Sequence, residues 1–231
     1  MMWRERNDGC LGWGLGILFL VITSVFWLVG AVFDREDRPD MDIYWLNQRI
    51  GDDFAGGIDG WNSPLAVWDG EGMLNLTVPT GEGFGAVVHE RPLGDVSIEA
   101  TFREIDVPAG STASIGVMCR AREEGSGYYF VVASNGQYSI QLARLGEDDL
   151  DMLVNWKETD ALLPFSQRNL INAACVQDYL ALYVNGRYVA EVTDRTYSHG
   201  RVGLTTAATG SGGEITANVD AVQVWQAAAR R

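Results

Sequence analysis

Histidine, cysteine and basic residues are all scarce in this 231-residue chain. It has two histidines and three cysteines, without the CxxC or His-rich spacing of zinc ligands, so we expect no structural zinc. Seventeen basic residues stand against 31 acidic ones, the formal net charge is −14, and the basic residues form no cluster. This balance argues against nucleic acid as a partner and against electrostatic adhesion to anionic lipid headgroups.

Two common functional motifs are also missing. No Gly-x-Ser-x-Gly nucleophile elbow occurs, and neither His89 nor His199 lies near an evident nucleophile. The glycine-rich residues 81–85 lead into a strand-like run at 86–89, whereas a phosphate loop follows a strand and opens a helix. We therefore interpret 81–85 as a flexible turn.

One long apolar run is present, because residues 11–33 contain no charged side chain. At about 1.5 Å per residue, a helix of this length spans roughly 34 Å, enough to cross a bilayer with some tilt. We predict an uncleaved transmembrane anchor at 11–33 after a cytoplasmic stub at 1–10. Gly12 and Gly16 form one Gly-x-x-x-Gly pair, a pattern that packs against another helix.

A cleaved signal peptide is the alternative for this segment. Residues 29–31 (Val-Gly-Ala) suit a signal peptidase, and Arg4 and Arg6 provide a charged n-region. A signal h-region usually runs about 7–15 residues, so the greater length of this run favours the anchor. The short stub is expected to stay inside, which places the rest of a single-pass chain outside the cytoplasm, in the periplasm or on the cell surface.

The cysteines bear on this compartment. Cys10 belongs to the stub, which leaves Cys119 and Cys175, both in strand-like runs. In an exported domain we predict a disulfide between these two residues. Two buried free thiols are the alternative, since cysteine is among the most buried residue types.

The chain after the anchor has the pattern of a β-sandwich. Residues 34–50 are predicted to be a juxtamembrane linker and residues 227–231 a C-terminal tail. Between them, residues 51–226 contain short apolar or alternating runs separated by Gly, Asn, Asp and Pro, without a long 3.6-residue period. This pattern predicts one all-β domain, an antiparallel two-sheet sandwich.

Two Asn-Gly pairs predict hairpins in this domain. Asn185-Gly186 lies between apolar runs and favours a type I′ turn, in which both central residues need positive φ. Asn135-Gly136 predicts a second hairpin. The first turn predicts the register Val184–Arg187, Tyr183–Tyr188, Leu182–Val189 and Ala181–Ala190.

Several short motifs follow one another in an order that carries a family resemblance. They are Asp53-Phe54 with Trp61, then residues 68–74, 116–120, 128–132, 135–138, 182–186, 200–204 and 218–224. Over residues 50–226 this order resembles the concanavalin A-like, laminin-G-like jelly-roll superfamily, and most of all bacterial domains related to the 3-keto-disaccharide hydrolase family. The resemblance implies a jelly roll, an architecture that hosts lectins, glycanases, adhesion modules and inert spacers.

The glycanase active site of this fold is incomplete in the sequence. Such enzymes carry a Glu-x-Asp-x-x-Glu strand, which places an acid and a nucleophile on one face. In residues 104–109 (Glu-Ile-Asp-Val-Pro-Ala), Ala109 replaces the last carboxylate and Pro108 interrupts the strand. We interpret this run as a strand end, and no catalytic residue is predicted.

Aromatic and polar residues supply the candidate binding site. Sugar-binding faces combine flat rings with amides and carboxylates, and the candidates are Tyr129, Gln141, Asn155, Trp156, Tyr183 and Tyr188. The alternative is that these rings fill the core or, for Tyr183 and Tyr188, stabilise their hairpin. The acidic residues Asp148, Asp149 and Asp151 are weak calcium candidates, with a solvated turn as the alternative, and no other cofactor is expected.

Three functions follow from these observations. The first is a membrane-anchored, extracytoplasmic and non-catalytic jelly-roll module that binds a glycan or a protein partner. The second is an accessory subunit of a membrane protein complex, with the helix packed on neighbouring helices. The third is a carbohydrate-active hydrolase.

Overall fold

The computed structural model describes residues 39–81, 83–103, 105–122, 125–147 and 149–230. The expected anchor at 11–33, with Gly12 and Gly16, and the stub that contains Cys10 lie outside these residues. The described part of the chain contains no helix that is long and apolar enough to cross a membrane.

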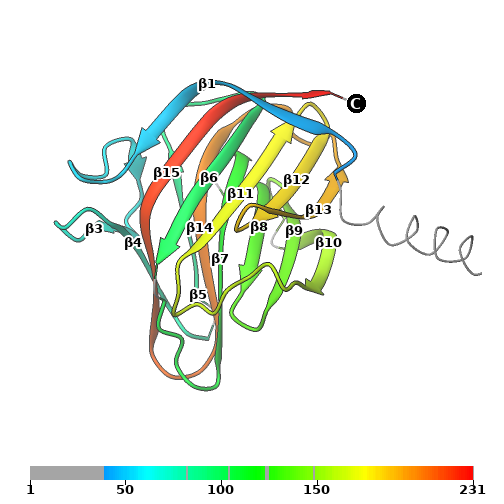
Figure 1. Ribbon diagram of the computed structural model, residues 1–231. Coiled ribbons are helices and arrows are strands. Elements are labelled where there is room, and N and C mark those ends of the chain that lie inside the picture. Colours follow the sequence, from blue (N-terminus) through cyan, green and yellow to red (C-terminus); the bar gives the residue numbers. More distant parts are fainter. Residues whose placement is uncertain (1–38, 82, 104, 123–124, 148, 231) are drawn as a thin grey trace, which may run out of the picture. The chain divides into compact units, whose positions relative to one another are not determined.

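The described residues form two antiparallel sheets (Figure 1), which confirms the predicted all-β sandwich. Sheet A has the order β13-β12-β11-β6-β15-β4-β3, and β1 also pairs with β15. Its strands are β1 (Asp42–Asp52), β3 (Ala66–Trp68), β4 (Leu74–Pro79), β6 (Val96–Arg103), β11 (Asn169–Val176), β12 (Tyr179–Val184), β13 (Arg187–Thr193) and β15 (Glu214–Arg230).

Sheet B has the order β10-β9-β8-β7-β14-β5-β2. Its strands are β2 (Trp61–Asn62), β5 (Gly83–His89), β7 (Ser111–Ala121), β8 (Gly127–Ala133), β9 (Gln137–Ala143), β10 (Leu150–Glu158) and β14 (Arg201–Gly210). Strand β5 continues through the run at 86–89, as predicted, but it already begins at Gly83, so the interpretation of 81–85 as a flexible turn is wrong for residues 83–85.

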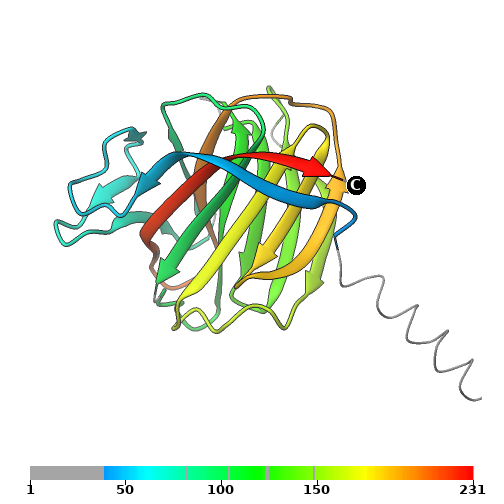
Figure 2. The same ribbon diagram turned by 45° about the horizontal axis from the view of Figure 1, so that its top comes forward.

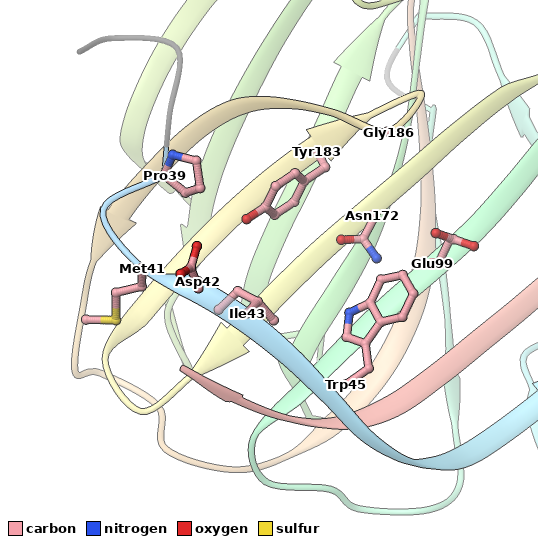
Figure 3. Close-up of a pocket in the computed structure, with 9 residues that line it drawn as sticks. All are labelled: Pro39, Met41, Asp42, Ile43, Trp45, Glu99, Asn172, Tyr183 and Gly186. Atoms are coloured by element: carbon pink, nitrogen blue, oxygen red, sulfur yellow. The ribbon is translucent and has the colours of Figure 1, made fainter. Parts of the chain in front are cut away.

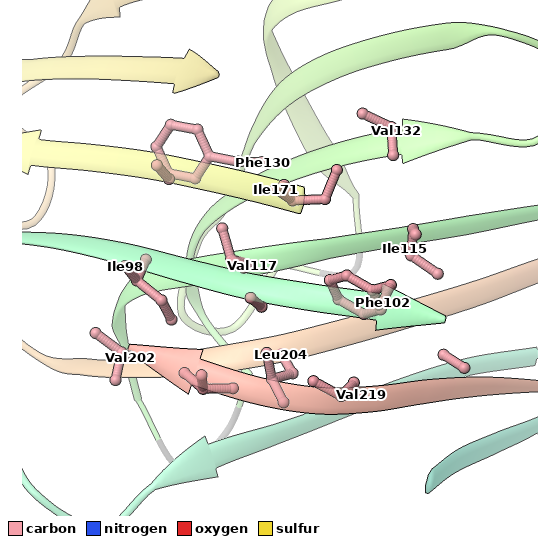
Figure 4. Close-up of a cluster of buried hydrophobic side chains, with 14 of the residues drawn as sticks. Ile98, Phe102, Ile115, Val117, Phe130, Val132, Ile171, Val202, Leu204 and Val219 are labelled. Atoms are coloured by element: carbon pink, nitrogen blue, oxygen red, sulfur yellow. The ribbon is translucent and has the colours of Figure 1, made fainter. Parts of the chain in front are cut away.

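The core lies between the two sheets and is built by alternate residues of each strand (Figure 4). Ile98 and Phe102 of β6 face Ile115 and Val117 of β7, and all four side chains are buried. Because successive side chains of a strand point to opposite faces, the intervening residues form the outer faces of the sandwich. Those outer faces hold the candidate sites described below.

A disulfide joins the two sheets through this core. Cys119 of β7 and Cys175 of β11 are bonded, which confirms the predicted pair. Both residues are fully buried among apolar side chains. The cross-link therefore fixes one sheet against the other.

Strand β1 differs from the linker expected at 34–50. It pairs with the second half of β15, from Asp42 opposite Arg230 to Asp52 opposite Val222, so residues 227–230 also belong to a strand rather than to a tail. Figure 2 shows this pair of strands crossing the outer face of sheet A. Met41 and Ile43 pack there against Tyr179 and neighbouring alanines, and this apolar contact holds the segment in place.

The β12–β13 hairpin agrees in part with its predicted register. Asn185 and Gly186 have φ angles of 52° and 77°, as a type I′ turn requires, and Val184–Arg187 and Tyr183–Tyr188 are paired. A bulge then shifts the register, so Leu182 pairs with Ala190 and Ala181 with Glu191. The predicted pairs Leu182–Val189 and Ala181–Ala190 are wrong because the bulge adds one unpaired residue. The second predicted hairpin joins β8 to β9.

Candidate functional site

The outer face of sheet B carries a row of buried side chains. Met118, Tyr129 and Gln141 are cross-strand neighbours on β7, β8 and β9. Tyr129 is 2% exposed and Gln141 5%, although neither points into the core between the sheets. A flat outer face would leave such side chains open to solvent, so this face is sheltered.

Curvature of the sheet explains this shelter. Phe84 lies on β5 and Tyr129 on β8, and the strands β14 and β7 separate them. Three strand spacings amount to about 14 Å, yet the two ring centroids are 5.8 Å apart. The rings meet because the sheet curls toward its outer face, which is therefore concave.

Glycine makes part of this curvature possible. A Cβ at Gly203 would lie 2.8 Å from the carbonyl oxygen of Val87 and 3.2 Å from the Sδ atom of Met118. Contacts under about 3 Å to backbone atoms force the chain to shift. Gly203 therefore allows β14 to approach both β5 and β7 closely on this face.

The concave outer face of sheet B holds a pocket of about 660 Å³, here called the sheet B pocket. Phe84 and Tyr129 contribute its rings, Leu150 an apolar wall, and Arg144 and Glu147 its charged groups. The ring of Phe84 is 49% exposed and available to a ligand. The Tyr129 hydroxyl donates a hydrogen bond to the carbonyl of Gly125, and burial raises the pKa of Tyr129 to about 12, so the phenol is neutral.

Arg144 is held at the rim of this pocket by an ion pair. Its Nε donates to Asp151 at 2.7 Å, and its Nη1 donates to the Thr196 hydroxyl at 3.5 Å. Asp151, a calcium candidate in the sequence, thus binds a guanidinium. Asp149 is exposed, and Asp148 lies outside the described residues. The described residues include no group of three or more side chains placed to hold a metal.

The six candidates from the sequence do not form one site. Tyr129 and Gln141 share the concave face of sheet B, whereas Tyr183 and Tyr188 pair edge to face on sheet A, with centroids 5.9 Å apart. Asn155 and Trp156 are exposed on the edge strand β10 and line neither of the pockets described here. Sequence reasoning missed Phe84 and Arg144, and the only signal for Phe84 was its place at the start of a strand after a glycine-rich turn.

A second pocket lies on the outer face of sheet A, beneath β1 (Figure 3). This sheet A pocket has a volume of about 290 Å³. Trp45 of β1, Glu99 of β6, Asn172 of β11 and Tyr183 of β12 face it. Burial raises the pKa of the Glu99 carboxyl.

Comparison with known proteins addresses the fold. No family model and no curated protein matches this sequence. Among solved structures, a carbohydrate-binding module CBM66 from Bacillus subtilis is 16% identical, with a TM-score of 0.54 over 71% of this chain and 94% of its own. A protein of unknown function with a galectin-like fold, also from Bacillus subtilis, is 12% identical, with a TM-score of 0.59 over 82% of this chain and 100% of its own.

A prokaryotic β-1,3-1,4-glucanase (lichenase) derived from a mouse hindgut metagenome is 13% identical, with a TM-score of 0.53 over 78% of this chain and 100% of its own. The likeness is one of fold. The described domain has the fold of these proteins, a galectin-like jelly-roll sandwich. At these identities the comparison does not extend to a specific family, and the resemblance to 3-keto-disaccharide hydrolases is not confirmed.

In this jelly roll, residues 105–109 lie outside any strand. Strand β6 ends at Arg103, Ile105 is buried in the core, and Pro108 accepts a hydrogen bond from Ser111 in the turn before β7. Asp106 is therefore not part of a row of carboxylates on a strand face. The interpretation of this run as a strand end is confirmed.

Proposed function

We propose that the jelly roll is a non-catalytic glycan-binding module and that its ligand lies in the sheet B pocket. The observation that carries the proposal is the Phe84–Tyr129 ring pair on a concave face, where Phe84 is half exposed. A flat ring stacks on the C–H face of a sugar, and concave sites of this kind combine apolar walls with a few polar groups. Arg144 and Glu147 supply those polar groups at the rim.

The structural neighbours support a glycan as the ligand. Their names include a carbohydrate-binding module, a carbohydrate recognition domain of Emp47p and glucanases. This chain shares their fold, and its own concave sheet B offers a surface for a chain of sugar units.

The non-catalytic part of the proposal is argued from the carboxylates at the sheet B pocket. A retaining glycosidase needs two carboxyl groups about 5 Å apart, one of them with a raised pKa. Among the described residues that line the sheet B pocket, Glu147 is the only carboxylate, and the adjacent Asp151 is paired with Arg144. The described acid with a raised pKa, Glu99, lies on the other sheet.

The proposal includes an anchor at 11–33 and an extracytoplasmic location. The uncharged length of that run supports the span, and a disulfide in the core suits an oxidising compartment. The module would then present the sheet B pocket at a membrane surface. Protease protection of the full chain in cells tests this part: an anchored, exported domain is digested only when protease is added outside the cytoplasmic membrane.

The binding proposal is tested with the full-length protein on a glycan array. A polyoxyethylene ether detergent is suitable because it carries neither a sugar nor an amine. We expect selective binding that Phe84→Ala abolishes or weakens about tenfold, whereas Trp156→Ala, a matched exposed ring outside the pocket, leaves it unchanged. A blank array, or equal effects of the two variants, would contradict the proposal, and saccharide turnover would contradict its non-catalytic part.

A further inference from the structure

The sheet A pocket has features that the glycan proposal does not use. Strand β1 forms its roof, because residues before and within β1 cross the outer face of β6, β11 and β12 (Figures 2 and 3). Met41 and Ile43 give this roof an apolar side. The pocket therefore lies between two layers of chain rather than on an open surface.

Two carboxylates give the pocket a negative charge, and Arg230, which lies opposite Asp42 in the β1–β15 pair, is not among the lining residues. Asp42 and Glu99 both line the pocket, and no described residue forms an ion pair or a hydrogen bond with either carboxylate. No lysine or arginine is among its lining residues. The neighbouring Glu191 adds to the negative field, since the pKa of Tyr183 is raised by burial and then by Glu191 and Asp42.

Two aromatic rings accompany these carboxylates. Trp45 stacks on Trp225 with a centroid distance of 4.5 Å and an interplanar angle of 7°, which holds the indole in place. Only one face of the indole is used in that stack, and the side chain remains 54% exposed. Tyr183 approaches from the opposite side of the pocket (Figure 3).

A buried amide completes the pocket. Asn172 is 8% exposed, and its Nδ2 donates a hydrogen bond to the Ser97 hydroxyl at 3.1 Å. This bond orients the amide, and its oxygen lies on the Tyr183 side of the pocket (Figure 3). That oxygen has no hydrogen-bond partner among the described residues and is available as an acceptor.

Carboxylates, electron-rich ring faces and an amide oxygen all attract positive charge, and each disfavours an anion. A volume of about 290 Å³ lies at the lower end of the range for ligand pockets, roughly 300–1,000 Å³, and limits the ligand to a small molecule. We propose that the sheet A pocket binds a small organic cation, either a quaternary ammonium or a protonated amine. This site is separate from the glycan site and does not depend on it.

The same charges indicate a free cation rather than a phospholipid headgroup. A phosphate next to the ammonium would meet Asp42, Glu99 and the nearby Glu191, and no basic side chain lines the pocket to bind it. We therefore expect choline to bind better than phosphocholine. Methyl groups of the ammonium would contact Ile43 and Met41 of the roof.

Calorimetric titration of the full-length protein in the polyoxyethylene detergent tests this proposal. The probes are choline chloride, phosphocholine and 3,3-dimethylbutan-1-ol, a neutral molecule with the shape of choline. We expect choline to bind, phosphocholine to bind at least several-fold more weakly, and the neutral alcohol to bind about tenfold more weakly or not at all.

Isosteric variants assign the binding to this pocket. Glu99→Gln and Asp42→Asn are each expected to weaken choline binding about tenfold, and Trp45→Phe to weaken it several-fold, because indole is the better cation partner. Glu147→Gln, which removes a charge from the sheet B pocket, should leave choline binding unchanged. Absence of choline binding, equal binding of the neutral alcohol, or an equal effect of Glu147→Gln would overturn the proposal.

Discussion

The disulfide offers a quantitative test of how the two sheets are held together. Cys119 and Cys175 are separated by 56 residues in sequence, and closing a loop of that size removes conformational entropy from the unfolded chain. The loop-entropy relation gives about 4 kcal/mol at 25 °C. Domains of this kind have unfolding free energies of about 5–15 kcal/mol, so the bond supplies a large share of the stability.

We expect reduction of this bond to lower the free energy of unfolding by about 3–5 kcal/mol. The starting protein is a full-length Cys10→Ser variant, in which the disulfide pair contains the only remaining cysteines. Urea unfolding is followed by tryptophan fluorescence with and without a phosphine reductant, because Trp61 is buried in the core.

The double variant Cys119→Ala/Cys175→Ala is the second arm, and it should lose at least as much because it also removes two buried sulfur atoms. Cys10→Ser alone should unfold like the unmodified chain. A loss below about 1 kcal/mol in both arms would refute the argument that the cross-link constrains the unfolded state. Two free thiols in the native, unreduced protein would refute the bond itself.

Two further predictions concern stability. Asn185→Ala should lower the free energy of unfolding in urea by about 2–3 kcal/mol, because Asn185 has positive φ and its side chain hydrogen-bonds to Ala161, Asn169 and Leu170. The control Asn135→Ala, in the exposed second hairpin, should lower it by less than about 1 kcal/mol. Equal losses for the two variants would contradict this prediction. For Glu99, burial raises the folded pKa above its ordinary value of 4.5, so the folded state binds the proton more tightly. Its contribution to stability is thus present below the unfolded pKa and lost as pH rises through the folded pKa. Unfolding curves from pH 4 to pH 7 should show that Glu99→Gln removes this part of the pH dependence, and identical profiles would refute the assignment.

Local patterns were enough to predict much of the fold. Alternating runs predicted the all-β sandwich, and Asn185-Gly186 predicted a turn whose two positive φ angles few other residue pairs adopt. The pairing of Cys119 with Cys175 was predicted from their strand-like runs and from the position of the third cysteine in the predicted stub. The strands and the turn depend on neighbouring residues, and the disulfide was predictable because only two cysteines remain outside the predicted stub.

Features set by distant contacts were not predictable in the same way. Strand β1 is a strand because it pairs with residues 222–230 at the other end of the chain, and its own mixed sequence resembles a linker. The bulge between Leu182 and Tyr183 interrupts the register that the turn sets. The register error in the hairpin has this origin.

Both pockets also arise from residues far apart in sequence. Phe84 and Tyr129 meet only because sheet B curls, and no local pattern encodes the position of β5 relative to β8. The sheet A pocket combines side chains from β1, β6, β11 and β12. Choosing aromatic residues by strand position alone therefore placed candidates on two different faces.

The central claim is that a glycan binds on the concave face of sheet B and contacts Phe84. The most direct measurement is the calorimetric dissociation constant of the best glycan found on the array, for the unmodified full-length chain, Phe84→Ala and Trp156→Ala. The account predicts a dissociation constant about tenfold higher for Phe84→Ala and an unchanged one for Trp156→Ala, with all three proteins equally stable to urea. An unchanged dissociation constant for Phe84→Ala would contradict it.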